Sequence, residues 1–126
     1  MTHKPDSLRE AVASSRVSFP ESVTDLVREA RTDKGDVLAV ARIAGIMAAK
    51  RTSALIPLCH PIPLTGAEVE LTLQPGSIGI VATVRTLAPT GVEMEALTAA
   101  SVAALTVYDM LKPHTTELEI GATRLV

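Results

Sequence analysis

Four segments of the chain alternate between apolar and polar positions, as β-strands with one buried face do. Residues 11–19 carry small or apolar side chains at the odd positions, which predicts a strand that ends before Pro20. Residues 64–74 and 78–87 alternate in the same way and flank a Pro-Gly-Ser turn, so they predict a β-hairpin. Residues 115–120 alternate again and predict a final strand.

Three further segments have helical spacing. Residues 21–30 place apolar side chains three and four positions apart, which predicts a short amphipathic helix. Residues 37–51 are apolar on nearly every side, which predicts a helix that is buried all round and begins at an aspartate cap. A long helix is expected from Val92 to about Lys112, because Thr90-Gly91 precedes it and Pro113 ends it.

The order of these elements indicates the fold class. Strand, helix, helix, strand, strand, helix and strand match the split βαβ, or ferredoxin-like, arrangement. We therefore expect an α+β fold with a four-stranded antiparallel sheet, two main helices and one short extra helix. The length of 126 residues suits a single domain over residues 1–126.

Composition restricts the possible partners. The formal net charge of -2 argues against a general nucleic-acid binder, and the presence of only two aromatic residues argues against base stacking. Hydrophobic residues make up 47% of the chain, more than so small a domain can bury alone. We therefore expect apolar contacts between subunits.

The single cysteine and the lengths of the apolar segments indicate the cellular compartment of the protein. The single cysteine, Cys59, allows no disulfide within the chain and fits a reducing compartment. The chain does not open with a secretory signal pattern. The longest uncharged stretch of the last helix, residues 96–108, is shorter than the ~20 residues that a membrane span needs. A cytoplasmic protein without a membrane segment is expected.

Charged residues on the long helix are the first candidates for chemistry. Asp109 and Lys112 are three positions apart and share one helix face, so they form either a surface ion pair or an acid/base pair. Glu93 and Glu95 can simply complement the positive end of the helix. Glu95 and Asp109 lie ~21 Å apart along the axis, so both contact one substrate only if that substrate is long or another subunit supplies one of them.

Other candidates lie in loops and at helix ends. Cys59-His60 lies in a proline-rich linker over residues 56–63, expected to be extended and stiff, and lacks the spacing of a zinc site. A lone histidine is more often structural, but a rigidly held imidazole can bind phosphate or transfer protons. Lys34 precedes a helix and either binds phosphate or is a solvated loop lysine. Lys50 can satisfy the last carbonyls of the second helix.

Several long blocks of sequence resemble one known family. They are KGDV at 34–37, ARIAGI at 41–46, AAKRT at 48–52, LIPLCHP at 55–61, TGVEMEALTA at 90–99 and ALTVYDM at 104–110. Together they resemble the cyclic pyranopterin monophosphate synthase family, also called molybdenum cofactor biosynthesis protein C. The resemblance covers nearly the whole chain.

The resemblance implies a ferredoxin-like fold, a homohexamer built as a trimer of dimers, and no metal or organic cofactor. It implies conversion of (8S)-3',8-cyclo-7,8-dihydroguanosine 5'-triphosphate, a small-molecule substrate, to cyclic pyranopterin monophosphate with release of pyrophosphate. By position, Asp109 and Lys112 correspond to the acid/base centre. The residues that correspond to the substrate-binding set are Leu58, Cys59, His60, Met94, Glu95, Lys34, Lys50 and, more weakly, Arg9.

The sequence also departs from the family pattern. Pro89 stands where a lysine is common before Thr-Gly, and Leu111 replaces a common cysteine. Family members usually continue into a glycine- and lysine-rich tail that supplies another active-site lysine, whereas the printed sequence ends at Val126. A second hypothesis is therefore a non-catalytic or weakly active oligomeric relative that binds a purine nucleotide.

Overall fold

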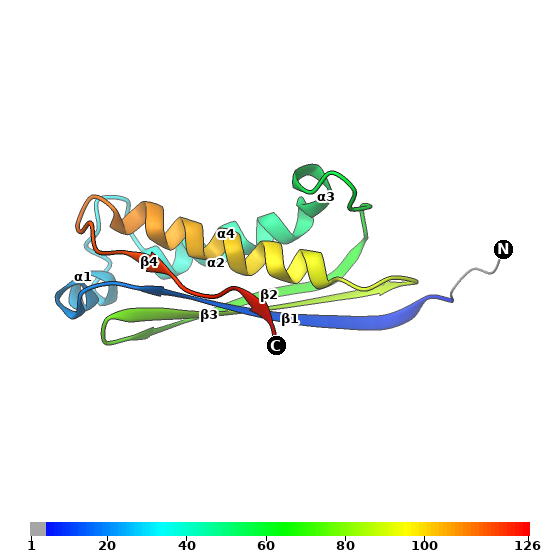
Figure 1. Cartoon of the computed structure of the whole chain (residues 1–126), viewed down its shortest axis with the longest axis horizontal. Helices are drawn as coiled ribbons and strands as arrows, with labels where there is room; N and C mark the ends of the chain where they lie inside the picture. The colour runs from blue at the N-terminus through cyan, green and yellow to red at the C-terminus, as the bar shows by residue number, and fades with distance from the viewer. Residues whose placement is uncertain (1–4) are drawn as a thin grey trace.

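A long antiparallel sheet forms one layer of the molecule, and the helices lie on one of its faces (Figure 1). The computed structural model describes residues 5–126. The sheet has the strand order β2-β3-β1-β4, with β2 at Leu64–Gln74, β3 at Ser77–Ala88, β1 at Ser7–Ser18 and β4 at Glu119–Ile120. This order, with the first strand beside the hairpin and the last strand at the edge, confirms the predicted ferredoxin-like α+β fold.

The final strand is divided into two short pieces. β4 pairs with β1 so that Ile120 lies opposite Val17, while β5 (Arg124–Leu125) pairs with β1 so that Arg124 lies opposite Ser14. The register shifts by one residue between them, as it does at a β-bulge. The predicted strand at 115–120 therefore exists only at its last two residues, and the second piece was not predicted.

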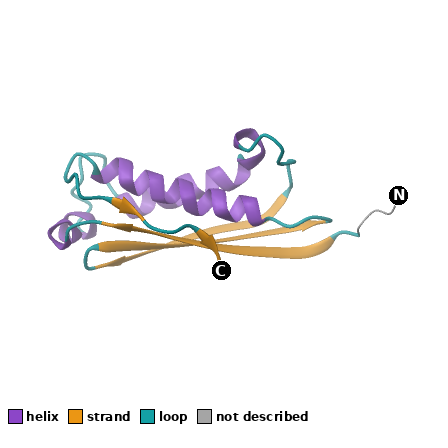
Figure 2. Ribbon diagram, in the orientation of Figure 1, coloured by secondary structure: helices purple, strands orange, loops and turns teal. Residues whose placement is uncertain are grey.

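Two antiparallel helices cover the sheet (Figures 1 and 2). α2 spans Val37–Lys50 and α4 spans Glu93–Leu111, close to the predicted bounds. The Asp36 side chain accepts a hydrogen bond from the backbone N–H of Ala39 at 3.2 Å, which caps α2 as predicted. At the other end of α2, the single turn α3 (Thr52–Leu55) leads into the loop before β2.

The core lies between the sheet and these helices. The inward faces of β1 and β3 supply Val17, Ile78 and Ile80, and α4 supplies a row of buried alanines. Small side chains let the helices approach each other closely. A Cβ atom added at Gly45 would lie 3.0 Å from the carbonyl oxygen of Ala99, so α2 and α4 touch at this glycine.

α2 is not buried on all sides, which corrects the prediction from its apolar sequence. Val40, Ile43 and Met47 are 42%, 59% and 45% exposed, and they share one side of the helix. The sheet and α4 cover the inner side, and no other segment of the described chain covers the outer one. The apolar surface left over is therefore available to another molecule.

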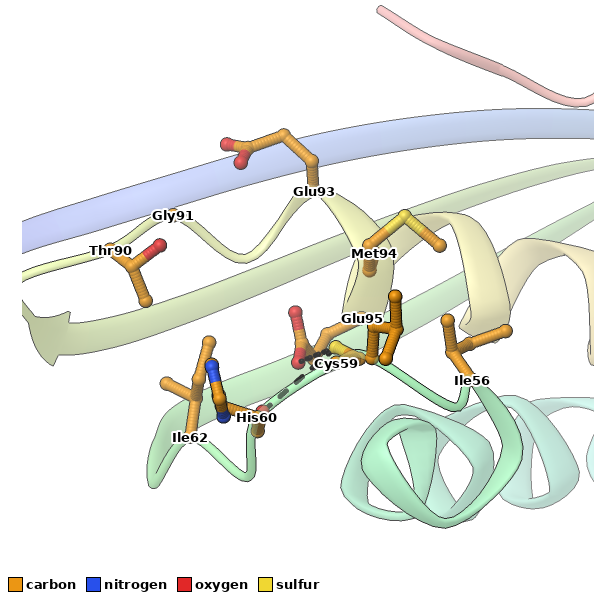
Figure 3. A pocket seen from close by; sticks show the side chains of 10 residues that line it. Ile56, Cys59, His60, Ile62, Thr90, Gly91, Glu93, Met94 and Glu95 are labelled. Carbon is orange, nitrogen blue, oxygen red and sulfur yellow. Dashed lines mark hydrogen bonds between the residues drawn. The ribbon is translucent and has the colours of Figure 1, made fainter.

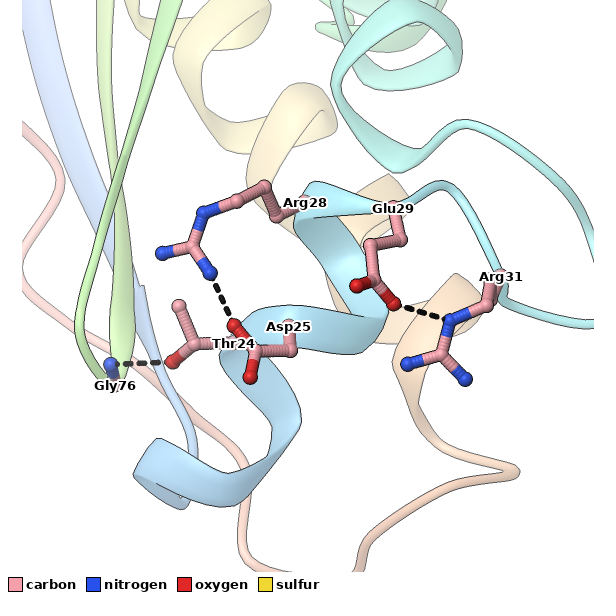
Figure 4. Close-up of polar contacts among 6 residues, drawn as sticks. All are labelled: Thr24, Asp25, Arg28, Glu29, Arg31 and Gly76. Carbon is pink, nitrogen blue, oxygen red and sulfur yellow. Dashed lines mark hydrogen bonds and ion pairs between the residues drawn. The ribbon is translucent and has the colours of Figure 1, made fainter.

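The short insertion between β1 and α2 consists of a 3-10 turn, η1 (Glu21–Val23), and α1 (Thr24–Arg28). The predicted helix over 21–30 thus ends earlier than expected. Buried Thr24 accepts a hydrogen bond from the N–H of Gly76 at 2.9 Å, which ties α1 to the turn of the hairpin (Figure 4). The exposed ion pairs of this insertion join residues that are close in the sequence, such as Arg28 and Asp25 (Figure 4).

α4 has 19 residues and is apolar enough to span a bilayer by length and composition alone. In this fold it is the central core helix, and half of the stretch concerned is buried against the sheet and α2. A buried core helix passes the same compositional test as a membrane span, so α4 gives no indication of a membrane protein.

Candidate active site

A cavity of about 370 Å³ opens beside the N-terminal end of α4 (Figure 3). The loop after α3 and the first turn of α4 form its walls. Five of the residues predicted to bind substrate line it: Leu58, Cys59, His60, Met94 and Glu95. Two motifs that are more than thirty residues apart in the sequence therefore meet at one site.

Glu95 is the most unusual group in this cavity. Its side chain is almost fully buried, with the residue 3% exposed, and Oε2 lies 3.8 Å from the sulfur of Cys59. Oε1 is buried without any hydrogen-bond partner. A buried carboxylate oxygen without a donor is costly, so this position favours a ligand that brings an N–H or O–H group.

Cys59 lies beside Glu95 and offers a weak S–H hydrogen-bond donor. Burial raises the pKa of its thiol, and the nearby Glu95 carboxylate raises that pKa further. The raised pKa favours the protonated thiol, and its sulfur lies 3.8 Å from Oε2 of Glu95 and 3.9 Å from the carbonyl oxygen of His60. The imidazole of His60 projects beside them into the cavity (Figure 3).

The proline-rich linker that carries these residues begins with a turn. The N–H of Cys59 donates to the carbonyl oxygen of Ile56 at 3.0 Å, so the chain folds back on itself at Pro57-Leu58. The prediction of an extended linker over the whole of residues 56–63 is wrong for its first half. The turn places Cys59 next to α4.

A second cluster lies at the opposite end of α4. The Asp109 carboxylate is held between two ammonium groups, with Nζ of Lys34 2.7 Å from Oδ2 and Nζ of Lys112 2.9 Å from Oδ1. The hydrogen bond from Lys34, then that from Lys112, lowers the pKa of Asp109 to about 2. Asp109 in turn raises the pKa of Lys112. Asp109 and Lys112 are thus both charged at neutral pH.

The loop before α2 presents Lys34 to this cluster. Thr32 and Gly35 close a tight turn, in which the Thr32 hydroxyl donates to the carbonyl oxygen of Gly35 at 2.6 Å. Gly35 has a φ of 98°, a left-handed conformation that a residue with a side chain would adopt only with strain. Lys34 lies at the tip of the turn, directed at α4.

The structure does not bring Arg9 or Lys50 into the cavity. The Arg9 side chain donates to the carbonyl oxygen of Ala88 at 3.0 Å, which holds it at the end of β3. Lys50 lines a separate hollow with the start of β2. Lys50 is the last residue of α2, which runs antiparallel to α4 and so ends near the start of α4 (Figure 1). Arg9 is near the same end, because Ala88 is only two residues before Thr90, which lines the cavity.

Sequence reasoning missed several cavity-lining groups. Thr90 and Gly91 appeared only as the entry to α4, and Glu93 only as a complement to the helix dipole, yet all three line the cavity. They belong to the same TGVEMEALTA block as Met94 and Glu95, and this shared block is the signal that could have identified them. Among residues 5–126, no group of three His, Cys, Asp or Glu side chains could hold a metal ion.

One chain therefore carries two separate half-sites: a cavity with a buried carboxylate, and a Lys–Asp–Lys cluster. Glu95 and Asp109 are fourteen positions apart on α4, which places them ~21 Å apart along the helix axis. No contact within the described chain joins the two half-sites.

Comparison with known proteins identifies the family. The MoaC family model matches residues 1–126. A protein of Thermomicrobium roseum is 56% identical over 128 aligned residues, which cover 100% of this chain and 77% of that protein. A protein of Cereibacter sphaeroides is 54% identical over 100% of this chain and 80% of its own length, and one of Brevibacillus brevis is 51% identical over 99% and 79%. All three are named cyclic pyranopterin monophosphate synthase. This chain belongs to the MoaC family.

Proposed function

We propose that this chain is a cyclic pyranopterin monophosphate synthase, a lyase of molybdenum cofactor biosynthesis that acts in the cytoplasm as one domain over residues 1–126. Its substrate is (8S)-3',8-cyclo-7,8-dihydroguanosine 5'-triphosphate, and its products are cyclic pyranopterin monophosphate and pyrophosphate. The observation that carries the proposal is the Asp109 carboxylate held between Lys34 and Lys112, in a chain that matches named synthases over its whole length.

The Lys–Asp–Lys cluster suits a polyanionic substrate that must gain and lose protons. One carboxylate and two ammonium groups leave a net positive charge, which attracts a triphosphate. Lys112 is a proton donor and Asp109 its partner, so together they can serve ring opening and reclosure. An ammonium group near the phosphates also offsets the charge that develops as pyrophosphate leaves.

The cavity suits the ring system of the same substrate. The unpartnered Oε1 of Glu95 accepts an N–H group of the purine-derived ring, and Cys59 and His60 supply further polar contacts. Leu58 and Met94 provide apolar contact with the faces of the ring. Recognition by hydrogen bonds agrees with a chain that has only two aromatic residues.

A second subunit would bring the cavity of one copy together with the Lys–Asp–Lys cluster of the other. A two-fold axis perpendicular to α4 would place the Asp109 end of one copy against the Glu95 end of its partner and so form two complete sites per dimer. The exposed apolar side chains of α2, with Leu105 and Tyr108 of α4, provide surface for such contacts. We propose that this dimer is the unit of a homohexamer.

The alternative, a non-catalytic oligomeric relative that binds a purine nucleotide, is not favoured. The relatives that align with the whole chain are named synthases. The residues proposed for proton transfer are present and in contact with one another. No observation on the fold or the cavity supports binding without turnover.

Turnover of the cyclised triphosphate by the purified protein tests the proposal. Pterin formation, followed by fluorescence after oxidation, and release of one pyrophosphate per pterin are expected. Tight binding of the substrate without either product would support the alternative instead.

A variant at Lys112 tests the assignment of the proton donor. Lys112→Ala should lower kcat/KM at least about 100-fold, as loss of a proton-transfer group does, while the protein stays folded because this side chain is more than half exposed. Arg28→Ala is the matched control, since Arg28 also forms an exposed i,i+3 ion pair, with Asp25. Equal turnover by the two variants would exclude Lys112 from the reaction.

A further inference from the structure

His114, which belongs to none of the sequence motifs, lies directly beside the loop that carries Lys34. It follows the C-terminal end of α4, where its N–H donates to the carbonyl oxygen of Leu111 at 2.9 Å. Its side chain is only 18% exposed. Nε2 accepts a hydrogen bond from the backbone N–H of Asp33 at 3.3 Å, a contact that joins residues 81 positions apart.

This contact is one of two polar links between the loop and the end of α4. The hydrogen bonds between Thr32 and Gly35 fix the shape of the turn, and the Asp36 cap fixes its junction with α2, but both are local to the loop. Among the described residues, the polar contacts between the loop and the end of α4 come from the Lys34–Asp109 pair and from His114 with Asp33. The long side chain of Lys34 is flexible, whereas the His114 contact is made to backbone.

Asp33 immediately precedes Lys34, so a fixed amide at position 33 restricts the path of the Lys34 side chain. Asp109 belongs to α4, Lys112 is the C-cap of this helix, and His114 follows two residues later. The loop before α2 and the C-terminal end of α4 lie at the same end of the molecule (Figure 1). A change at His114 would therefore move Lys34 relative to an Asp109 that stays in place.

We propose that His114 is a positioning residue that holds the Asp33-Lys34 backbone against the end of α4 and so places the Lys34 ammonium on Asp109. Its catalytic consequence rests on the proposed synthase function; its structural consequence does not. The role needs an acceptor at the position of Nε2, which the imidazole provides when its proton is on Nδ1. Glutamine retains such an acceptor, and leucine fills similar space without one.

Hydrogen exchange of the full chain tests the structural part. In His114→Leu, exchange of the amides in the loop over residues 32–35 should speed up about tenfold, because loss of the contact makes local opening easier. In His114→Gln it should stay within about threefold of the wild type. Exchange that is unchanged in His114→Leu, or raised equally in both variants, would overturn the proposal.

Steady-state kinetics test the catalytic part. His114→Leu should lower kcat/KM about tenfold, and His114→Gln should restore most of the loss. In a Lys34→Ala background, His114→Leu should change kcat/KM less than about twofold, because His114 acts only through Lys34. A full additional loss in that background, or no loss in the single variant, would contradict the role. Absence of turnover by the wild type would contradict the synthase assignment, while hydrogen exchange would still decide whether His114 holds the loop.

Discussion

At the scale of single residues, Asp109 is both a weak base and the anchor of two ammonium groups. In the free protein its pKa is lowered to about 2, chiefly by the hydrogen bond from Lys34, so it is a weak base that anchors two cations. A substrate phosphate that drew Lys34 away would remove the largest cause of this shift and raise the basicity of the carboxylate. Binding of the triphosphate and activation of Asp109 would then be coupled.

The pKa of Asp109 predicts how its contribution to stability depends on pH. A carboxyl with a folded pKa of about 2 and an ordinary value of 3.8 stabilises the fold above pH 3.8 and loses this contribution as pH falls through 2. The unfolding free energies of wild type and Asp109→Asn should therefore differ by a constant amount between about pH 5 and 8, and converge in more acidic solution.

Urea unfolding of the two proteins at low ionic strength, repeated across this pH range, measures that difference. Asp25→Asn is a useful comparison, because Asp25 pairs with Arg28 in an exposed i,i+3 contact without a second cation. A difference between wild type and Asp109→Asn that grows on acidification would show that the two lysines do not stabilise the Asp109 carboxylate.

At the scale of the elements, the contact between α2 and α4 depends on small residues. Gly45 faces the backbone of α4 at Ala99 and the side chains of Val69 and Ala103. Because α2 carries the N-terminal loop with Lys34, any separation of the two helices also moves Lys34 away from Asp109. Packing at Gly45 thus connects the core with the ion-pair cluster.

Gly45→Ala should destabilise the protein by about 1–3 kcal/mol, because overpacking at 3.0 Å outweighs the better helix propensity of alanine. Thermal unfolding measures the loss. Gly66→Ala is the control, since a Cβ atom there would have its nearest neighbour at 3.8 Å. A variant at Gly45 that is as stable as the wild type would mean that the helices separate easily.

The period of the sequence pattern predicted most of these elements. The hairpin and the two long helices have the expected bounds within one or two residues, because period 2 and helical spacing are strong over ten or more positions. The bulged last strand was not predictable, because a register shift depends on the partner strand and not on local alternation. The single turn of α3 is too short to produce a periodic signal.

The site was predictable only in part, for a similar reason. Local motifs identified Cys59, Glu95 and Asp109, whose chemistry is visible in the sequence. The contact between Lys34 and Asp109 joins residues 75 positions apart, and the contact of His114 with the loop has no motif at all. Tertiary packing alone brings such residues together.

At the scale of the whole molecule, the outer side of α2 carries apolar side chains that the described chain does not cover. Its apolar sequence predicted complete burial, whereas the fold leaves one side uncovered. Periodicity reports that a side chain prefers an apolar environment, but not whether its own chain provides one. An assembly of several copies would bury the apolar side of α2 that the fold of one chain leaves exposed.

Ile43→Glu should weaken that assembly, because it places a charge in the middle of the exposed apolar side of α2. Native mass spectrometry and gel filtration should show smaller species than for the wild type at the same concentration. Thr116→Glu adds the same charge at an exposed loop and should leave the assembly unchanged. A wild-type protein that is already a stable monomer would contradict the proposed oligomer.

The most direct test of a synthase site shared between two subunits is complementation between inactive variants. Glu95→Gln and Asp109→Asn should each abolish product formation alone. Coexpressed with different tags and purified as mixed assemblies, they should recover about a quarter of wild-type turnover, because random pairing gives half of the dimers one intact site out of two. No recovery in mixed assemblies, with each variant folded and the wild type active, would contradict a shared site.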